Sequence, residues 1–185
     1  DLRVDLRVRS ATYYTGTGEA STGADTVDVD FVDFEDLLPA VPRKVLFIGN
    51  SLTYWNDGLG PHFQAMAALG EPALELVSNH ICRGGYSLQD HWTEEPPEAY
   101  EALVNDGYDW VVLQGSPSSM VADLGNYTYY AERFMAAADG VGATASLFLP
   151  HSYEGEDEYI DTIIEACEGV GAANDVPVIP INQAW

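Results

Sequence analysis

Apolar runs of strand length alternate with amphipathic segments along the chain from Lys44 onward. Most of these runs lack the polar alternation of a half-exposed strand, so they predict strands that are buried on both faces of a sheet. The five predicted strands are Val45–Gly49, Ala73–Ser78, Trp110–Gln114, Ala145–Leu149 and Val176–Ile181.

The segments between these strands predict four helices, because their apolar residues recur at helical spacing. Strands that alternate with helices are typical of an α/β protein with a parallel, doubly wound sheet, and right-handed crossovers place helices on both faces of that sheet. Helices are expected at Pro61–Leu69, near Pro97–Asn105, at Tyr127–Ala138 and along the apolar stripe of Ile160, Ile163, Ile164, Cys167 and Val170.

Residues 1–43 follow a different pattern. The sequence DLRV at Asp1–Val4 is repeated at Asp5–Val8, and Val27–Phe34 alternates apolar with acidic residues. A period of two predicts a half-exposed strand, so we expect a β-hairpin or edge strands in this region. The sequence therefore predicts an N-terminal extension at 1–43 and an α/β domain at 44–185, with prolines at the junction.

The charge of the chain limits its partners. It carries 30 acidic and 7 basic residues, a net charge of -23, and only one of the basic residues is a lysine. Such a surface repels nucleic acids and anionic membranes, and no apolar run reaches the roughly 18 residues of a membrane span. We therefore expect no nucleic acid partner and no membrane insertion. Extreme acidity also suggests a halophilic protein, because salt screens self-repulsion.

The two cysteines, Cys82 and Cys167, form neither a disulfide framework nor a zinc site by their number and spacing. The cysteines therefore do not determine the cellular compartment, and we slightly favour an extracellular or periplasmic location. The oligomeric state is also open.

Three short segments could carry chemistry, and each follows a predicted strand. They are Gly49-Asn50-Ser51, Gly84-Gly85 and Gln114-Gly115-Ser116. The carboxyl ends of parallel strands meet at one edge of a doubly wound sheet, so these segments should converge. A serine nucleophile needs a base and donors for the developing oxyanion. The N–H groups of Ser51 and Gly85 and the side-chain amide of Gln114 are donors of that kind.

These segments resemble the conserved blocks of the SGNH/GDSL hydrolases. F-I-G-N-S-L-T at 47–53 is similar to block one, with Asn50 in place of the usual Asp, as in one branch of the superfamily. Residues 83–91, R-G-G-Y-S-L-Q-D-H, resemble block two, whose glycine corresponds to Gly85. Residues 108–116 stand where block three, G-x-N-D, is expected. There Gln114 occupies the Gly position and Ser116 the Asn position, and the branch that begins G-N-S commonly has V-V-L-Q at this point.

The resemblance implies a three-layer α/β/α fold with a five-stranded, flavodoxin-like parallel sheet. It also implies a serine esterase that hydrolyses acyl esters on carbohydrates or small molecules, with Ser51 as nucleophile and no metal or organic cofactor. Gly85 and Gln114 would support the oxyanion. The expected partner is a small-molecule or glycan ester, and the residues expected to contact it are Asn50, Tyr86, Ser116 and His151.

The family takes its general base from a D-x-x-H block after the last strand. This sequence ends at Trp185 without that block, and residues 182–185 resemble the segment that precedes it. We therefore expect a chain that is truncated before its base, and without a base the serine is a poor nucleophile. His151, which follows the fourth strand, is a candidate catalytic or substrate-contacting residue, whereas His91 is expected to order the block-two loop.

Other interpretations stay open. A non-catalytic carbohydrate-binding module would explain the missing D-x-x-H and the aromatic residues Trp55, Tyr86 and Trp92 near the site. A flavin or phosphate binder using 49–53 is disfavoured, because that loop lacks a run of Ser and Thr. Ser51 could also serve only as a helix N-cap. The acidic residues at 154–158 are expected to start a helix rather than bind calcium.

Overall fold

The computed structural model describes residues 43–55, 58–70, 73–153 and 155–184. In this part of the chain five parallel strands form one sheet, in the order β2-β1-β3-β4-β5. This is the flavodoxin-like order of a doubly wound sheet, and it confirms the predicted fold class. The strands are β1 (Lys44–Gly49), β2 (Val77–Cys82), β3 (Trp110–Gln114), β4 (Thr144–Phe148) and β5 (Val178–Ile179).

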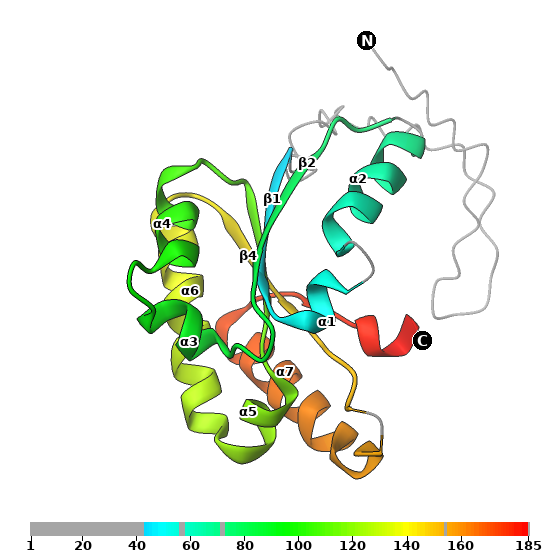
Figure 1. Ribbon diagram of the computed structural model, residues 1–185, viewed down its shortest axis with the longest axis vertical. Coiled ribbons are helices and arrows are strands. Elements are labelled where there is room, and N and C mark those ends of the chain that lie inside the picture. Colours follow the sequence, from blue (N-terminus) through cyan, green and yellow to red (C-terminus); the bar gives the residue numbers. More distant parts are fainter. Residues whose placement is uncertain (1–42, 56–57, 71–72, 154, 185) are drawn as a thin grey trace, which may run out of the picture. The chain divides into compact units, whose positions relative to one another are not determined.

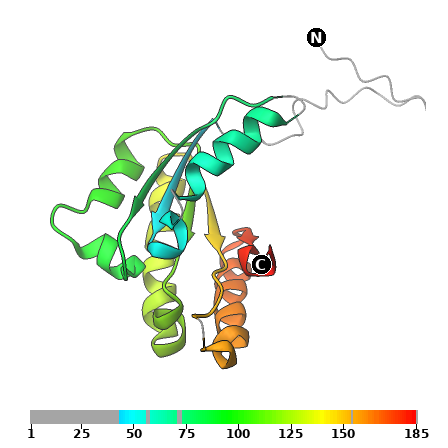
Figure 2. The same ribbon diagram turned by 45° about the vertical axis from the view of Figure 1, so that its right-hand side comes forward.

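Helices cover both faces of the sheet, as Figures 1 and 2 show. Helix α2 packs on one face, where Leu59 and Phe63 contact the strand side chains Val45, Phe47 and Val112. The larger core lies on the opposite face, beneath α3 to α7. The helices are α1 (Ser51–Tyr54), α2 (Leu59–Leu69), α3 (Leu88–Thr93), α4 (Glu98–Asn105), α5 (Pro117–Ala122), α6 (Leu124–Gly140) and α7 (Ile160–Asn174), with short 3-10 turns at η2 (Asp157–Tyr159) and η3 (Ile181–Ala184).

Successive residues of β1 enter the two cores in turn. Leu46 and Ile48 belong to the larger core, whereas Val45 and Phe47 belong to the smaller one. A strand buried on both faces has no polar positions, which explains why its sequence is a continuous apolar run. The same arrangement in β3 explains why the predicted Trp110–Gln114 matches the observed strand.

Two predicted strands differ from the structure. β2 begins at Val77, whereas the prediction placed it at Ala73–Ser78 and left Cys82 in the following loop. β2 is an edge strand with a partly exposed surface, so its sequence VSNHIC is not an apolar run. The apolar Leu76, which precedes the strand, packs in the smaller core on the face covered by α2. β5 is limited to two residues, because Pro177 and Pro180 flank it and proline has no N–H to donate to a sheet.

The predicted hairpin in residues 1–43 and the boundary between the two predicted domains lie almost wholly outside the described residues, so both stay predictions. In the described part of the chain, no helix is both long and apolar enough to cross a membrane.

Candidate active site

The loops that follow β1, β2 and β3 meet at the carboxyl edge of the sheet, and Asn50 joins them. Its backbone N–H donates to Gln114 Oε1 at 2.8 Å, at the end of β3. Its side-chain Nδ2 donates to the carbonyl of Tyr86 at 3.0 Å, in the loop after β2. The residue next to Ser51 therefore fixes all three predicted segments to one another.

Ser51 is the first residue of α1 and is partly exposed. The N-cap of this helix is Asn50, whose Oδ1 accepts from the N–H of Leu52 at 3.1 Å. The interpretation of Ser51 as a helix cap is therefore wrong. Within the part of the chain that the structure describes, the Ser51 hydroxyl makes no hydrogen bond, so it is open to a substrate.

Two backbone donors on the loops after β1 and β2 are also unused. Neither the N–H of Ser51 nor that of Gly85 has an acceptor among the described residues. Gly85 has a φ of 77° and lies exposed in a turn that is closed by a bond from the Tyr86 N–H to the Arg83 carbonyl at 3.1 Å. Glycine suits this left-handed conformation because it has no Cβ. These two N–H groups are donors of the kind that an oxyanion requires.

Gln114 lies in a different environment from the one expected. Its side chain is 1% exposed, and its Oε1 accepts from the Asn50 N–H and from the Thr53 hydroxyl, the latter at 3.0 Å. Its Nε2 donates to the carbonyl of Gly115 at 2.6 Å. Both ends of the amide are thus engaged inside the protein. This geometry places Gln114 as a residue that positions Asn50, and gives no support to a side-chain donor for the oxyanion.

The peptide unit between Gly49 and Asn50 is held at both ends. Its carbonyl accepts from His91 Nε2 at 2.7 Å and from the Arg83 N–H at 3.1 Å, while its N–H donates to Gln114. The close approach requires glycine, because a Cβ at residue 49 would lie 2.6 Å from Gln114 Oε1 and 2.8 Å from Thr53 Oγ1. Thr53 was not predicted to contribute, although it belongs to the sequence block that contains Ser51.

His91 holds this carbonyl from helix α3. The helix begins with a capping box between Ser87 and Asp90, and the His91 side chain is 0% exposed. Burial lowers the pKa of His91, and the bond to the Gly49 carbonyl and the charge of Glu94 act in the opposite direction. Because a carbonyl only accepts, His91 carries its proton on Nε2. His91 was expected to order the block-two loop, whereas its hydrogen bond reaches Gly49 in block one.

The remaining predicted site residues follow the strands on either side of β1 and the next strand beyond. The ring of Tyr86 packs edge-on against His91, with centroids 5.0 Å apart. Ser116 is buried and begins helix α5 without a side-chain capping bond. His151 follows β4, two strands along the sheet from β1, and its Nδ1 lies 2.6 Å from the Ser152 carbonyl.

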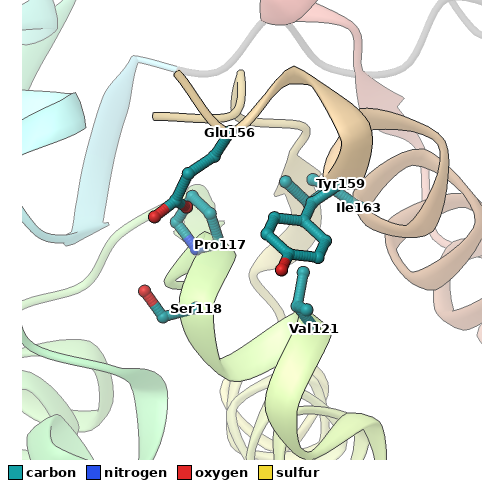
Figure 3. Close-up of a pocket in the computed structure, with 6 residues that line it drawn as sticks. All are labelled: Pro117, Ser118, Val121, Glu156, Tyr159 and Ile163. Carbon is teal, nitrogen blue, oxygen red and sulfur yellow. The ribbon is translucent and has the colours of Figure 1, made fainter. Parts of the chain in front are cut away.

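A cavity of about 200 Å³ lies beyond the third loop, between α5 and the start of α7. One wall of the cavity is formed by Pro117 and Ser118, the first residues of α5. Figure 3 shows the Glu156 carboxylate and the Ser118 hydroxyl on one side and the Tyr159 ring beside Val121 and Ile163 on the other. The cavity thus combines a polar side with an apolar side, which suits a small group of mixed polarity.

The architecture belongs to a known class, the three-layer α/β/α proteins with a flavodoxin-like sheet and a site at its carboxyl edge. No protein-family model matches the chain, and no curated protein matches its sequence. Solved structures do match. A proposed SGNH hydrolase from Slackia heliotrinireducens is 22% identical, with a TM-score of 0.62 over 77% of this chain and 83% of the other.

Two further similar structures are a lipase/acylhydrolase from Enterococcus faecalis and a catalytic mutant of an acetylxylan esterase from Geobacillus stearothermophilus. The first is 17% identical, with a TM-score of 0.56 over 77% of each chain. The second is 13% identical, with a TM-score of 0.57 over 74% of this chain and 75% of the other. The chain therefore has the SGNH-hydrolase fold, and the resemblance drawn from the sequence blocks is confirmed at the level of the fold.

Proposed function

We propose that the protein is a serine ester hydrolase in which Ser51 is the nucleophile. The proposal depends above all on the way that Asn50 anchors three loops and leaves the Ser51 hydroxyl unbonded, among the described residues, at the carboxyl edge of the sheet. A side chain with no structural bond, placed on a backbone that several bonds fix, is the arrangement that a preorganised nucleophile needs.

In the proposed reaction, Ser51 Oγ attacks the ester carbonyl carbon and its proton passes to a general base. The negative charge that develops on the carbonyl oxygen is stabilised by the N–H groups of Ser51 and Gly85, each contributing about 3 kcal/mol. The C–O bond to the alcohol then breaks, and the alcohol leaves with the proton. Water hydrolyses the acyl-enzyme by the same steps and restores the Ser51 hydroxyl.

The base is a separate question. His91 does not suit the role, because it is buried and its Nε2–H is bound to the Gly49 carbonyl. His151 is partly exposed and follows a strand that ends at the same edge of the sheet. The family resemblance instead assigns the base to a D-x-x-H block. Turnover by His151→Gln at the wild-type rate would exclude His151 as the base.

We propose a small, uncharged ester as substrate, carried on a glycan or on a small alcohol. The net charge of -23 repels anionic esters, and the cavity between α5 and the start of α7 has room for a group of modest size. The acyl-ester substrates named for two of the structural neighbours support the same class.

The test is hydrolysis of p-nitrophenyl acetate by Ser51→Ala, with Ser152→Ala as the matched control. We expect Ser51→Ala to lose at least about 10³-fold in kcat, because the covalent step is lost, while Ser152→Ala stays near the wild-type rate. Labelling with a fluorophosphonate, followed by mass spectrometry, should place the adduct on Ser51. Unchanged turnover by Ser51→Ala would rule out the proposal.

A glycan-binding module is the second candidate. Trp55 supports it, since this residue directly follows α1 and is 74% exposed. An exposed indole ring beside the site can stack on a sugar. Glycan binding that is lost in Trp55→Ala, together with no hydrolysis of any ester by the wild type, would favour this function over the esterase.

A further inference from the structure

His91 and Glu94 bring two buried hydrogen-bond acceptors together behind the strand that carries Ser51. His91 donates from Nε2 to the Gly49 carbonyl, so its Nδ1 has no proton when the ring is neutral. This Nδ1 lies 4.0 Å from Glu94 Oε1. Both atoms are shielded from solvent, and neither has a hydrogen-bond partner among the described residues.

An unpartnered buried acceptor is costly, and in this pair two of them face each other. One added proton gives both acceptors a partner at once, while burial of the ring still opposes its positive charge. If Nδ1 becomes an N–H group, a single hydrogen bond to Oε1 links the two side chains after a closure of the gap. Neither side chain can turn away freely, because His91 is bound to Gly49 and the other carboxylate oxygen of Glu94 lies 3.3 Å from Arg83.

We propose that His91 is a positioning residue for Ser51 and that His91 and Glu94 act as a buried pair that takes up one proton from solvent between Nδ1 and Oε1. The proton changes the charge on the ring that holds the Gly49 carbonyl. An imidazolium donates more strongly than a neutral imidazole, so the peptide that precedes Ser51 is held more tightly when the pair is protonated. The catalytic part of this inference depends on the proposed esterase function.

Among residues 43–55, 58–70, 73–153 and 155–184, few other charged groups face the pair. Arg83 lies on the loop after β2 and bonds to both Glu94 and Glu98, and Tyr86 stacks on His91 from the same loop. Asp90 belongs to the capping box on α3 itself. Arg133 on α6 lies over the ring of Trp92. Glu94 is therefore the carboxylate that lies against His91 Nδ1. Glu98 forms an ion pair with the same Arg83 but does not face the imidazole ring.

The direct test is NMR of the His91 ring nitrogens as a function of pH. At pH 7 we expect the neutral ring with its proton on Nε2, and protonation on Nδ1 below the usual midpoint of about 6.5, since burial lowers the pKa of His91. Glu94→Gln should lower that midpoint further by about one pH unit, because an opposite charge is lost. Glu98→Gln is the matched control and should change it little.

Equal midpoints in the wild type and Glu94→Gln, or a neutral ring with its proton on Nδ1, would overturn the proposed pair. Neither measurement requires turnover, so they decide the pair even if the protein hydrolyses no ester.

The catalytic part is tested by comparing His91→Gln with His91→Leu on p-nitrophenyl acetate. Glutamine can place an N–H group near the position of Nε2, whereas leucine cannot, so His91→Gln should retain kcat within about tenfold and His91→Leu should lose more, with KM similar in both. The kcat of the wild type should change with pH at the NMR midpoint, and this change should be absent in His91→Gln. The general base adds a pH dependence of its own, which both the wild type and His91→Gln should show. Equal kcat values for the two variants, or a difference in pH profile between wild type and His91→Gln that does not fall at the NMR midpoint of His91, would overturn the positioning role.

Discussion

The two halves of the carboxyl edge of the sheet are built in different ways. Around β1, β2 and β3, hydrogen bonds between different loops fix the backbone beside Ser51, and the side chains that make them are buried. Around β4 and β5, the edge consists of a partly exposed His151, a two-residue strand and a cavity with Glu156 and Tyr159 at its wall. The difference suggests that the first half sets the position of the nucleophile, while the second half adapts to the substrate.

The largest expected effect comes from adding one methyl group to the first half. In Gly49→Ala the new Cβ would collide with Gln114 Oε1 and Thr53 Oγ1, so the peptide before Ser51 must move. We expect a loss of about 3 kcal/mol or more in the free energy of unfolding and loss of turnover by the folded fraction. Chemical denaturation and p-nitrophenyl acetate hydrolysis measure the two effects.

Gly171→Ala is the matched change in the second half. Its Cβ would lie 2.6 Å from Val178 Cγ2, so it should also destabilise the protein, but the fraction that folds should keep its turnover. Equal losses of turnover per folded molecule in the two variants would remove the distinction between the halves.

The next effect in size is expected from Gln114→Met, which keeps the length of the side chain and removes its amide. The Asn50 N–H and the Thr53 hydroxyl then lose their buried acceptor. We expect a loss of about 2–4 kcal/mol in the free energy of unfolding, because each unsatisfied group costs about 1–3 kcal/mol. Gln64→Met is the control: it removes one bond from α2 to the Leu76 carbonyl and should cost about 1 kcal/mol.

A smaller effect concerns the pH dependence of stability. Burial lowers the pKa of His91, so the unfolded chain binds a proton at this residue more readily than the folded chain does. The resulting stability is complete above the unfolded pKa of about 6.5 and is lost as the pH falls from there toward the lower folded value. Between pH 7 and pH 5, the Tm of the wild type should therefore fall more than that of His91→Gln. Parallel Tm curves would contradict this assignment.

The smallest effect is expected in the second half. Glu156→Gln removes an exposed carboxylate from the cavity wall and should change the free energy of unfolding by less than about 0.5 kcal/mol. Turnover of a small neutral ester should stay within about twofold of the wild type, while KM for larger or charged esters should change. If Glu156→Gln abolished turnover of p-nitrophenyl acetate, the second half would have to be assigned to the chemistry itself.

The sequence predicted the strands correctly where burial on both faces makes their residues uniformly apolar. β1, β3 and β4 are buried on both faces, and their apolar runs placed them within one residue of the observed ends. β2 is an edge strand with a mixed surface, so the pattern failed there. The short helices α1, α3 and α5 were not predicted as separate elements, because four to six residues contain too little periodicity.

The sequence predicted which loops form the candidate site, but it predicted the roles of the individual side chains in those loops less well. The block resemblance identified the loops that Asn50 joins. It could not show which way an amide turns, so the sequence assigned Gln114 to the oxyanion, whereas the structure directs its oxygen toward Asn50 and Thr53. It also gave no sign that Glu94 faces His91, since that contact depends on the packing of α3 against the end of β1.

The fixed peptide before Ser51 also limits how this scaffold can be redesigned. Its two ends are held by the segment 83–91 and by Gln114, which lie far from it and from each other in the sequence, so a loop taken from another protein would bring only part of the set. Engineers who wish to alter selectivity should leave residues 49–53, 91 and 114 together as one unit and diversify the region around α5 and η2, where no comparable set of bonds would be broken among the described residues.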